Sequence, residues 1–115
     1  MSHVKQVPVA VAGNERAALI QRWLRATRER LPSLAAVENW PIFLDHCFMR
    51  VCLDTALGSP WTATVDRPAI RTMTDAQLAA AVAVAEGILA EPARLPELNA
   101  RSLAGRRAAR LTTKP

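Results

Sequence analysis

The stretch HCFMRVCLD, residues 46–54, combines ionisable side chains with the most apolar part of the chain. On a helix, which advances about 100° per residue, His46, Arg50 and Asp54 lie on one face at i, i+4, i+8 spacing. Neighbours in this series can touch, so Arg50 and Asp54 are expected to form an ion pair. Because an isolated buried charge is costly, each of these groups must find a partner.

Two interpretations of this polar stripe stay open. In the first, the three side chains satisfy one another and the following connector, since buried polar groups are usually hydrogen-bonded for structural reasons. In the second, the stripe lines a pocket or ligand site together with two tryptophans that flank the helix. The residues of that candidate pocket are Trp40, His46, Arg50, Asp54 and Trp61.

The same stretch offers little for catalysis or metal binding. Cys47 is adjacent to His46 and points elsewhere on a helix, whereas a nucleophilic pair needs facing side chains. Arg50 cannot complete a metal-ligand pair because arginine is always protonated. Cys47 and Cys52 are five residues apart and project about 140° from each other on a helix, so they cannot bond there. They also lack CxxC spacing, and both are expected to be free thiols. We assign no catalytic residue, metal ligand or cofactor, and expect a non-enzyme.

The formal net charge of +5 is unevenly placed. Residues 101–115 hold five of the fifteen bases and no acid, so the other 100 residues hold ten bases and ten acids. A basic end of this kind suggests phosphate contacts to nucleic acid. The candidate nucleic-acid-binding residues are Arg101, Arg106, Arg107, Arg110 and Lys114, with Arg22, Arg25 and Arg28 on the first predicted helix.

Start and stop signals predict four main helices. Asn14 is a suitable N-cap for a first helix that runs to about Arg30 and stops at Pro32, after which Ser33 caps a short turn. A central helix is expected over Pro41–Leu57 with Gly58 as its stop. Thr74 and Gln77 form a capping box for a third helix that ends at Glu91-Pro92. Its apolar stripe is Leu78, Ala81, Val82, Ala85, Ile88 and Leu89.

A fourth helix is expected from Pro96, with Leu98, Ser102 and Leu103 facing inward. These elements predict an all-α fold: a single small bundle of about four helices around a buried central helix. The expected organisation is a loose arm at 1–13, a helical domain at 14–104 and a basic tail at 105–115. Removal of residues 104–115 should then leave the fold intact.

No transmembrane segment is predicted. The longest mostly apolar run, Leu78–Ala90, is shorter than the roughly 20 residues that a membrane helix needs. The N-terminal VPVAVAG is a poor signal peptide because its apolar part is short and no cleavage pattern follows it. The expected localisation is cytoplasmic.

The run NWPIFLDHCFMRVCLDTALGSPW, followed by RPAIRTMTDAQLAAAVAVAEGILAEPARLPELNARSL, resembles a small, mostly uncharacterised helical family of bacteria and fungi. The resemblance covers about residues 39–104, and some members are loosely labelled GCN5-related N-acetyltransferases. That label implies a mixed sheet and a Gln/Arg-x-x-Gly-x-Gly/Ala loop for coenzyme A. The four glycines here are isolated, so the resemblance implies a helical fold and no specific activity.

Three classes of function follow. The first is a non-catalytic protein associated with nucleic acid through the basic tail and the arginines of the first helix. The second is a protein-interaction module or homodimer, with helices one and three donating the surface. The third is an enzyme or small-ligand binder that uses the His46, Arg50 and Asp54 stripe.

Overall fold

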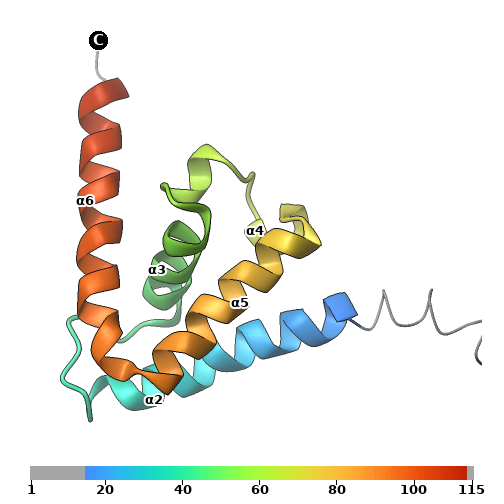
Figure 1. Cartoon of the computed structure of the whole chain (residues 1–115), viewed down its shortest axis with the longest axis vertical. Helices are drawn as coiled ribbons and strands as arrows, with labels where there is room; N and C mark the ends of the chain where they lie inside the picture. Colours follow the sequence, from blue (N-terminus) through green and yellow to red (C-terminus); the bar gives the residue numbers. More distant parts are fainter. Residues whose placement is uncertain (1–14, 114–115) are drawn as a thin grey trace, which may run out of the picture.

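The computed structural model describes residues 15–113, in which helices and turns occur and no strand is found (Figure 1). The predicted all-α class is confirmed. Residues 15–24 are helical and continue into the π-helix η1 (Arg25–Arg30) and into α2 (Leu31–Ala35). The other elements are α3 (Asp45–Leu57), η2 (Trp61–Ala63), α4 (Ala69–Thr72), α5 (Asp75–Ala90), η3 (Pro92–Arg94) and α6 (Leu95–Thr113). The expected arm at 1–13, the Asn14 cap and Lys114 lie outside the described residues.

The first helical segment does not stop at Pro32, so that prediction is wrong. The chain passes through η1, where the backbone N–H of Leu31 bonds the carbonyl of Ala26, five residues back. This wider turn relieves the clash that a proline ring makes with the carbonyl four residues before it in an α-helix. Ser33 lies inside α2 instead of capping a new turn, and its Oγ donates to the Glu29 carbonyl at 2.7 Å.

The central helix α3 starts later than the sequence predicted. Pro41 lies at a bend in the segment before the helix, and Leu44 occupies the N-cap position. The predicted stop is confirmed: Gly58 has φ +71°, a left-handed conformation that glycine adopts without steric cost, and its N–H bonds the Asp54 carbonyl at 2.9 Å. The late start leaves residues 36–44 as a non-helical segment before α3.

The hydrophobic core surrounds α3, which packs against η1, α5 and α6. Phe48, Val51 and Cys52 of α3 are fully buried. Trp40 closes one end of the core, where its ring meets Phe48 edge-on with a centroid distance of 5.7 Å. The expected position of the central helix within the bundle is therefore observed (Figure 1).

Helix α5 agrees closely with its sequence signals. Thr74 Oγ1 accepts from the Gln77 N–H at 3.1 Å, and Gln77 Oε1 accepts from the Thr74 N–H at 2.9 Å. These two bonds confirm the capping box. The stripe is buried as predicted, with Leu89 at its half-buried edge: Leu78, Ala81, Val82, Ala85 and Ile88 have no exposed surface.

The last helix, α6, lies beside α3 and runs in the same direction. Leu98 and Ser102 face inward as predicted, but Leu103 is 49% exposed, so its assignment to the inner face is wrong. The helix continues unbroken to Thr113 through residues that the sequence assigned to a tail. Figure 1 shows its last turn rising past the other helices. None of the helices over residues 15–113 has the length and apolar character that a membrane crossing needs.

Candidate functional site

Asp54 of α3 is held by four hydrogen bonds at the contact between α3 and α6. Arg106 donates twice, from Nε to Oδ2 at 2.8 Å and from Nη2 to Oδ1 at 3.0 Å. Ser102 Oγ donates to Oδ2 at 2.6 Å, and the backbone N–H of Trp61 donates to Oδ1 at 2.8 Å. Only 4% of the Asp54 side chain is exposed. Both carboxylate oxygens are therefore hydrogen-bonded within the protein. The bidentate arginine–carboxylate pair is among the stronger hydrogen-bonded contacts in proteins.

Arg50 reaches the same helix but does not pair with Asp54. Its Nη1 donates to Ser102 Oγ at 2.7 Å and its Nη2 donates to Asn99 Oδ1 at 2.8 Å. The expected ion pair within α3 is therefore wrong. Ser102 connects the two residues, because its hydroxyl accepts from Arg50 and donates to Asp54. We call Arg50, Asp54, Asn99, Ser102 and Arg106 the α3–α6 network.

His46 takes no part in this network. Its side chain is 73% exposed, and its Nδ1 lies 3.5 Å from Oδ1 of the neighbouring Asp45. His46, Arg50 and Asp54 follow one face of α3, but that face is exposed to solvent at the first turn of the helix and buried at the last. Nearness along a helix does not ensure a shared environment.

The polar groups of the network leave no unpaired buried atom. Every buried side-chain nitrogen or oxygen in the described part of the chain has a hydrogen-bond partner. Asn99 and Ser102 are themselves buried, on the side of α6 that meets α3. This geometry corresponds to the first interpretation of the stripe, with the partners supplied by α6 rather than by the connector alone.

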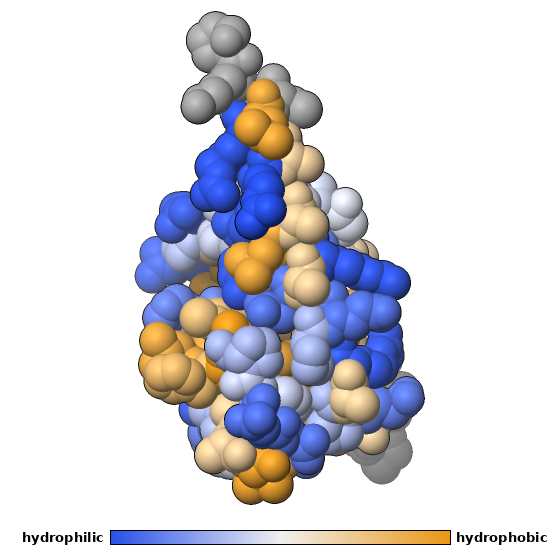
Figure 2. Space-filling view, turned by 90° about the vertical axis from the view of Figure 1, so that its left-hand side faces the viewer, coloured by the Kyte–Doolittle hydropathy of each residue, from blue (hydrophilic) through white to orange (hydrophobic). Residues whose placement is uncertain are grey.

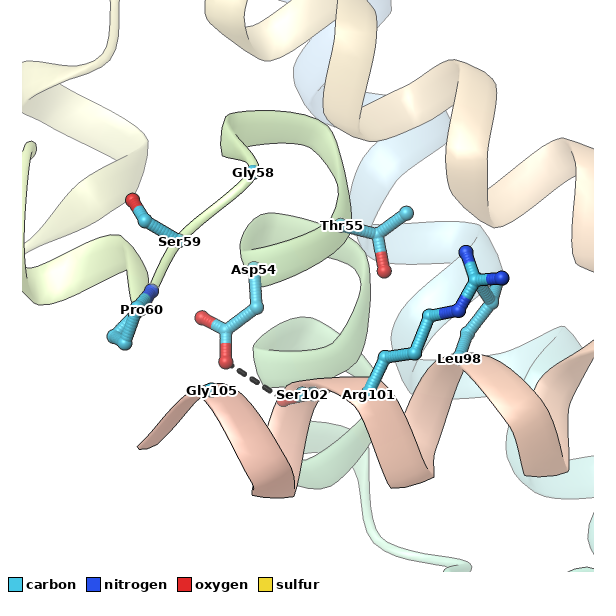
Figure 3. A pocket seen from close by; sticks show the side chains of 9 residues that line it. All are labelled: Asp54, Thr55, Gly58, Ser59, Pro60, Leu98, Arg101, Ser102 and Gly105. Atoms are coloured by element: carbon cyan, nitrogen blue, oxygen red, sulfur yellow. Dashed lines mark hydrogen bonds between the residues drawn. The ribbon is translucent and has the colours of Figure 1, made fainter. Parts of the chain in front are cut away.

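A cleft of about 240 Å³ lies beside the network, between the end of α3, the following loop and α6 (Figure 3). Figure 3 shows Asp54 directed at Ser102 of α6. Of the five residues expected in the pocket, Asp54 alone lines this cleft, and its oxygens are already occupied. The cleft thus presents no free acid or base for proton transfer. Its lining residues are Asp54, Thr55, Gly58, Ser59, Pro60, Leu98, Arg101, Ser102 and Gly105.

The two tryptophans lie in different surroundings and do not frame a common pocket. Trp40 is buried, and its Nε1 donates to the Pro92 carbonyl at 3.2 Å, which joins the 36–44 segment to the start of α6. Trp61 is half-buried, and the guanidinium of Arg67 lies 5.4 Å from its ring centroid. Their contacts are those of side chains that close the bundle and stack on a surface cation.

The cysteines are free, as expected. Burial raises the pKa of the Cys52 thiol to about 12, so the reactive thiolate is suppressed at neutral pH. Cys47 is half-buried. Within residues 15–113, no group of three or more His, Cys, Asp or Glu side chains is arranged to hold a metal ion.

The arginines expected to contact nucleic acid separate into distinct environments. Arg106 is committed to Asp54, and Arg101 lies 3.5 Å from Glu97 on the surface of α6. Arg22 forms an ion pair with Glu86 of α5, which lowers the pKa of that carboxyl. Part of the predicted basic tail therefore belongs to the folded domain, and removal of residues 104–115 would take Arg106 away from Asp54.

The arginines of the first helical segment do not share one face as predicted. Arg28 is directed toward α3, where its Nε lies 3.9 Å from Asp45 Oδ2. Arg25 lines two adjacent shallow grooves beside α5, and Arg30 lines both with it. Sequence periodicity missed Arg30, because the i, i+5 relation to Arg25 becomes one face only in a π-helix. Neither Arg25 nor Arg30 forms an ion pair within 4 Å in the described residues.

Three comparisons with known proteins were negative. No protein family, no curated protein and no solved structure matches the chain. Functional arguments therefore depend on the geometry of the chain itself.

Proposed function

We propose that the chain is a non-catalytic protein associated with nucleic acid, and that it contacts phosphate groups through the arginine surface beside α5. This surface consists of Arg25 and Arg30, with Arg22 at its edge. The observation that carries the proposal is that Arg25 and Arg30 are exposed, line the same two grooves and make no ion pair within the described residues. Each of these two guanidinium groups can donate hydrogen bonds to a phosphate group of a nucleic-acid backbone.

The chemistry of the cations supports a phosphate ligand. All thirteen basic side chains between residues 15 and 113 are arginines, and the two lysines lie outside this range. The guanidinium fork matches phosphate oxygens in a bidentate way that an ammonium group does not. Glu86 neutralises Arg22 and also lies near enough to Arg30 for that arginine to lower the pKa of Glu86. A second carboxylate, Glu29, lines one of the two grooves beside Arg25 and Arg30. The surface is therefore modestly basic, and the binding is expected to be weak and independent of sequence.

Salt-dependent binding tests the proposal directly. We expect a labelled duplex to bind the full chain in an anisotropy titration at low salt. If Arg25 and Arg30 each reach one phosphate, the log–log salt slope has a magnitude of about 2. The double substitution Arg25→Gln and Arg30→Gln should remove most of the binding. Arg71→Gln, an exposed arginine on α4, is the matched control and should leave affinity nearly unchanged.

The contradicting outcomes are distinct. No binding by the full chain at low salt would remove the nucleic-acid proposal. Equal losses in Arg71→Gln and in the double variant would show that net charge matters and that the groove does not. Loss on changing Arg107 alone would move the site to the end of α6.

A second function, protein interaction, is favoured by a different observation. The first helical segment and α5 correspond to the first and third predicted helices, which the sequence suggested for this role. Both bury their apolar faces against the core. In the described part of the chain, the large hydrophobic residues that are exposed lie on α6 and on the segment before α3.

A further inference from the structure

Exposed apolar side chains gather on two segments of the molecule, residues 36–44 and helix α6. Five large hydrophobic residues are exposed in the described part of the chain, and all five belong to these segments. Figure 2 looks onto α6 and shows apolar side chains along the helix between hydrophilic ones. Single exposed apolar residues are ordinary, but their concentration on adjoining segments marks an interaction surface. They are Val37, Phe43, Leu44, Leu103 and Leu111, exposed by 78%, 66%, 45%, 49% and 67%.

On α6 these residues belong to one continuous strip. The helix places positions 100, 103, 104, 107, 108 and 111 on the side opposite the network residues Ser102 and Arg106. All six are exposed. The three alanines among them allow the backbone of another helix to approach closely. We call this strip the outer face of α6; it comprises Ala100, Leu103, Ala104, Arg107, Ala108 and Leu111.

The 36–44 segment lies beside the first turns of α6 rather than its last. Trp40 binds the carbonyl of Pro92, just before the helix begins. Helices α3 and α6 run in the same direction, since Arg50 meets Asn99 and Asp54 meets Arg106. Phe43 and Leu44 therefore form the apolar end near the start of α6, and Leu111 forms the apolar end near its finish.

The two ends of this surface also carry opposite charge. The end near residues 36–44 carries four carboxylates. Asp45 lies 3.9 Å from Arg28 and Glu97 lies 3.5 Å from Arg101, whereas Glu38 and Glu91 form no ion pair within 4 Å in the described residues and keep this end acidic. The far end of α6 is basic, because no acid follows Glu97 in the sequence. A surface that is acidic and apolar at one end, and basic and apolar at the other, complements itself when rotated by two-fold symmetry. The acidic residues are Glu38, Asp45, Glu91 and Glu97; Arg107 and Arg110 are at the basic end.

We infer that the outer face of α6 and the 36–44 segment bind a second copy of this chain, with the two α6 helices antiparallel. The two-fold axis passes between Ala100 and Ala104, so that Ala104 packs on Ala100 of the other copy and Arg107 lies opposite its Glu97. Leu111 of each copy contacts Phe43 and Leu44 of the other, and Arg107 faces the acidic end. A parallel arrangement would instead bring acids to acids and arginines to arginines. This inference does not depend on the nucleic-acid proposal, which uses a different surface.

The area available indicates a weak, concentration-dependent dimer. The nineteen residues of α6 span about 28 Å, and a strip about 10 Å wide covers roughly 300 Å² on each copy. The 36–44 segment adds to this, but the total stays near the lower limit for specific interfaces. We expect dissociation in the micromolar range, roughly 1–100 μM.

Sedimentation velocity of the full chain over a concentration series tests the dimer. The wild type should change from monomer to dimer, and Ala104→Glu should weaken association at least ten-fold. The new carboxylate can pair with Arg101 and Arg107 within its own helix, so its effect is not expected to come from unfolding. The matched control is Ala83→Glu, at an alanine of α5 that is also exposed, and it should dimerise like the wild type. A wild type that stays monomeric, or an Ala104→Glu variant that associates normally, would overturn the inference.

Charge reversal tests the antiparallel orientation separately. Arg107→Glu should weaken self-association, because it brings a carboxylate to the acidic end of the other copy. A mixture of Arg107→Glu and Glu97→Arg should associate more tightly than either variant alone. In a parallel dimer, Arg107→Glu would only replace one like-charged pair with another. Unchanged association of Arg107→Glu would therefore contradict the antiparallel arrangement.

Discussion

The two sides of α6 depart from the usual distribution of residues on a surface helix. Its inner side buries Leu95 and Leu98 but also carries three polar groups, Asn99, Ser102 and Arg106, each of which is hydrogen-bonded to α3. Its outer face presents alanines and leucines to solvent. A polar residue is not necessarily at the surface, nor an apolar one in the core. What decides is whether a partner is available to each group.

The availability of partners on α6 also explains why the polar stripe of α3 suggests an active site in the sequence but is a hydrogen-bonded contact between helices in the structure. Asp54 has the burial that often accompanies a catalytic acid. Its two oxygens are nevertheless filled by Arg106, Ser102 and the Trp61 backbone. A catalytic carboxyl must keep an oxygen available to the substrate, so the same residue type has a different role here.

The largest expected effect tests the inner side. Arg106→Ala removes both guanidinium bonds to a buried carboxylate, and we expect a loss of about 3 kcal/mol in unfolding free energy. The value is placed at the lower end because 28% of the Arg106 side chain is exposed and water can enter. Urea unfolding followed by circular dichroism measures it. The matched control is the next residue, since Arg107→Ala on the outer face should change stability by less than about 0.5 kcal/mol.

Truncation of α6 is a second test of the contact between Arg106 and Asp54. Removing residues 104–115 also removes Arg106 and should destabilise the chain at least as much as Arg106→Ala does. Removing residues 112–115 spares the network and should be nearly neutral. A stable fold after the longer truncation would show that the bond to Asp54 contributes little.

An intermediate effect is expected at Arg50. Its partners Asn99 and Ser102 are neutral, so Arg50→Ala leaves polar groups short of a bond but strands no charge. We expect a loss of roughly 1–3 kcal/mol, smaller than that of Arg106→Ala. The two variants should be compared by chemical denaturation under identical conditions. The reverse order of the losses would mean that Arg50 is the principal cation for Asp54.

The smallest effect is expected on the outer face. Leu103 is half exposed, so Leu103→Gln should change the unfolding free energy of the monomer by no more than about 0.5 kcal/mol. Thermal unfolding at a concentration below dimer formation is the suitable measurement. A large loss would indicate that Leu103 belongs to the monomer core and would weaken the distinction between the two sides of α6.

Local signals in the sequence predicted much of the fold because they act over a few residues. The Thr74–Gln77 box needs only one turn of backbone, and Gly58 needs only its own φ angle. The buried stripe of α5 follows from helical periodicity alone. Each of these features could be derived without knowing what lies opposite.

The sequence by itself therefore determined the helical class, the ends of α5 and the stop of α3, since caps and periodicity are properties of neighbouring residues. Only the tertiary structure decided that Asp54 pairs with Arg106, 52 residues away, and not with Arg50 four residues before it. The same holds for Pro32, whose clash is removed by the π-helical turn before it. A partner for a buried charge depends on which helix faces meet. That choice follows from packing of the whole core around α3, so residue spacing within one helix cannot supply it.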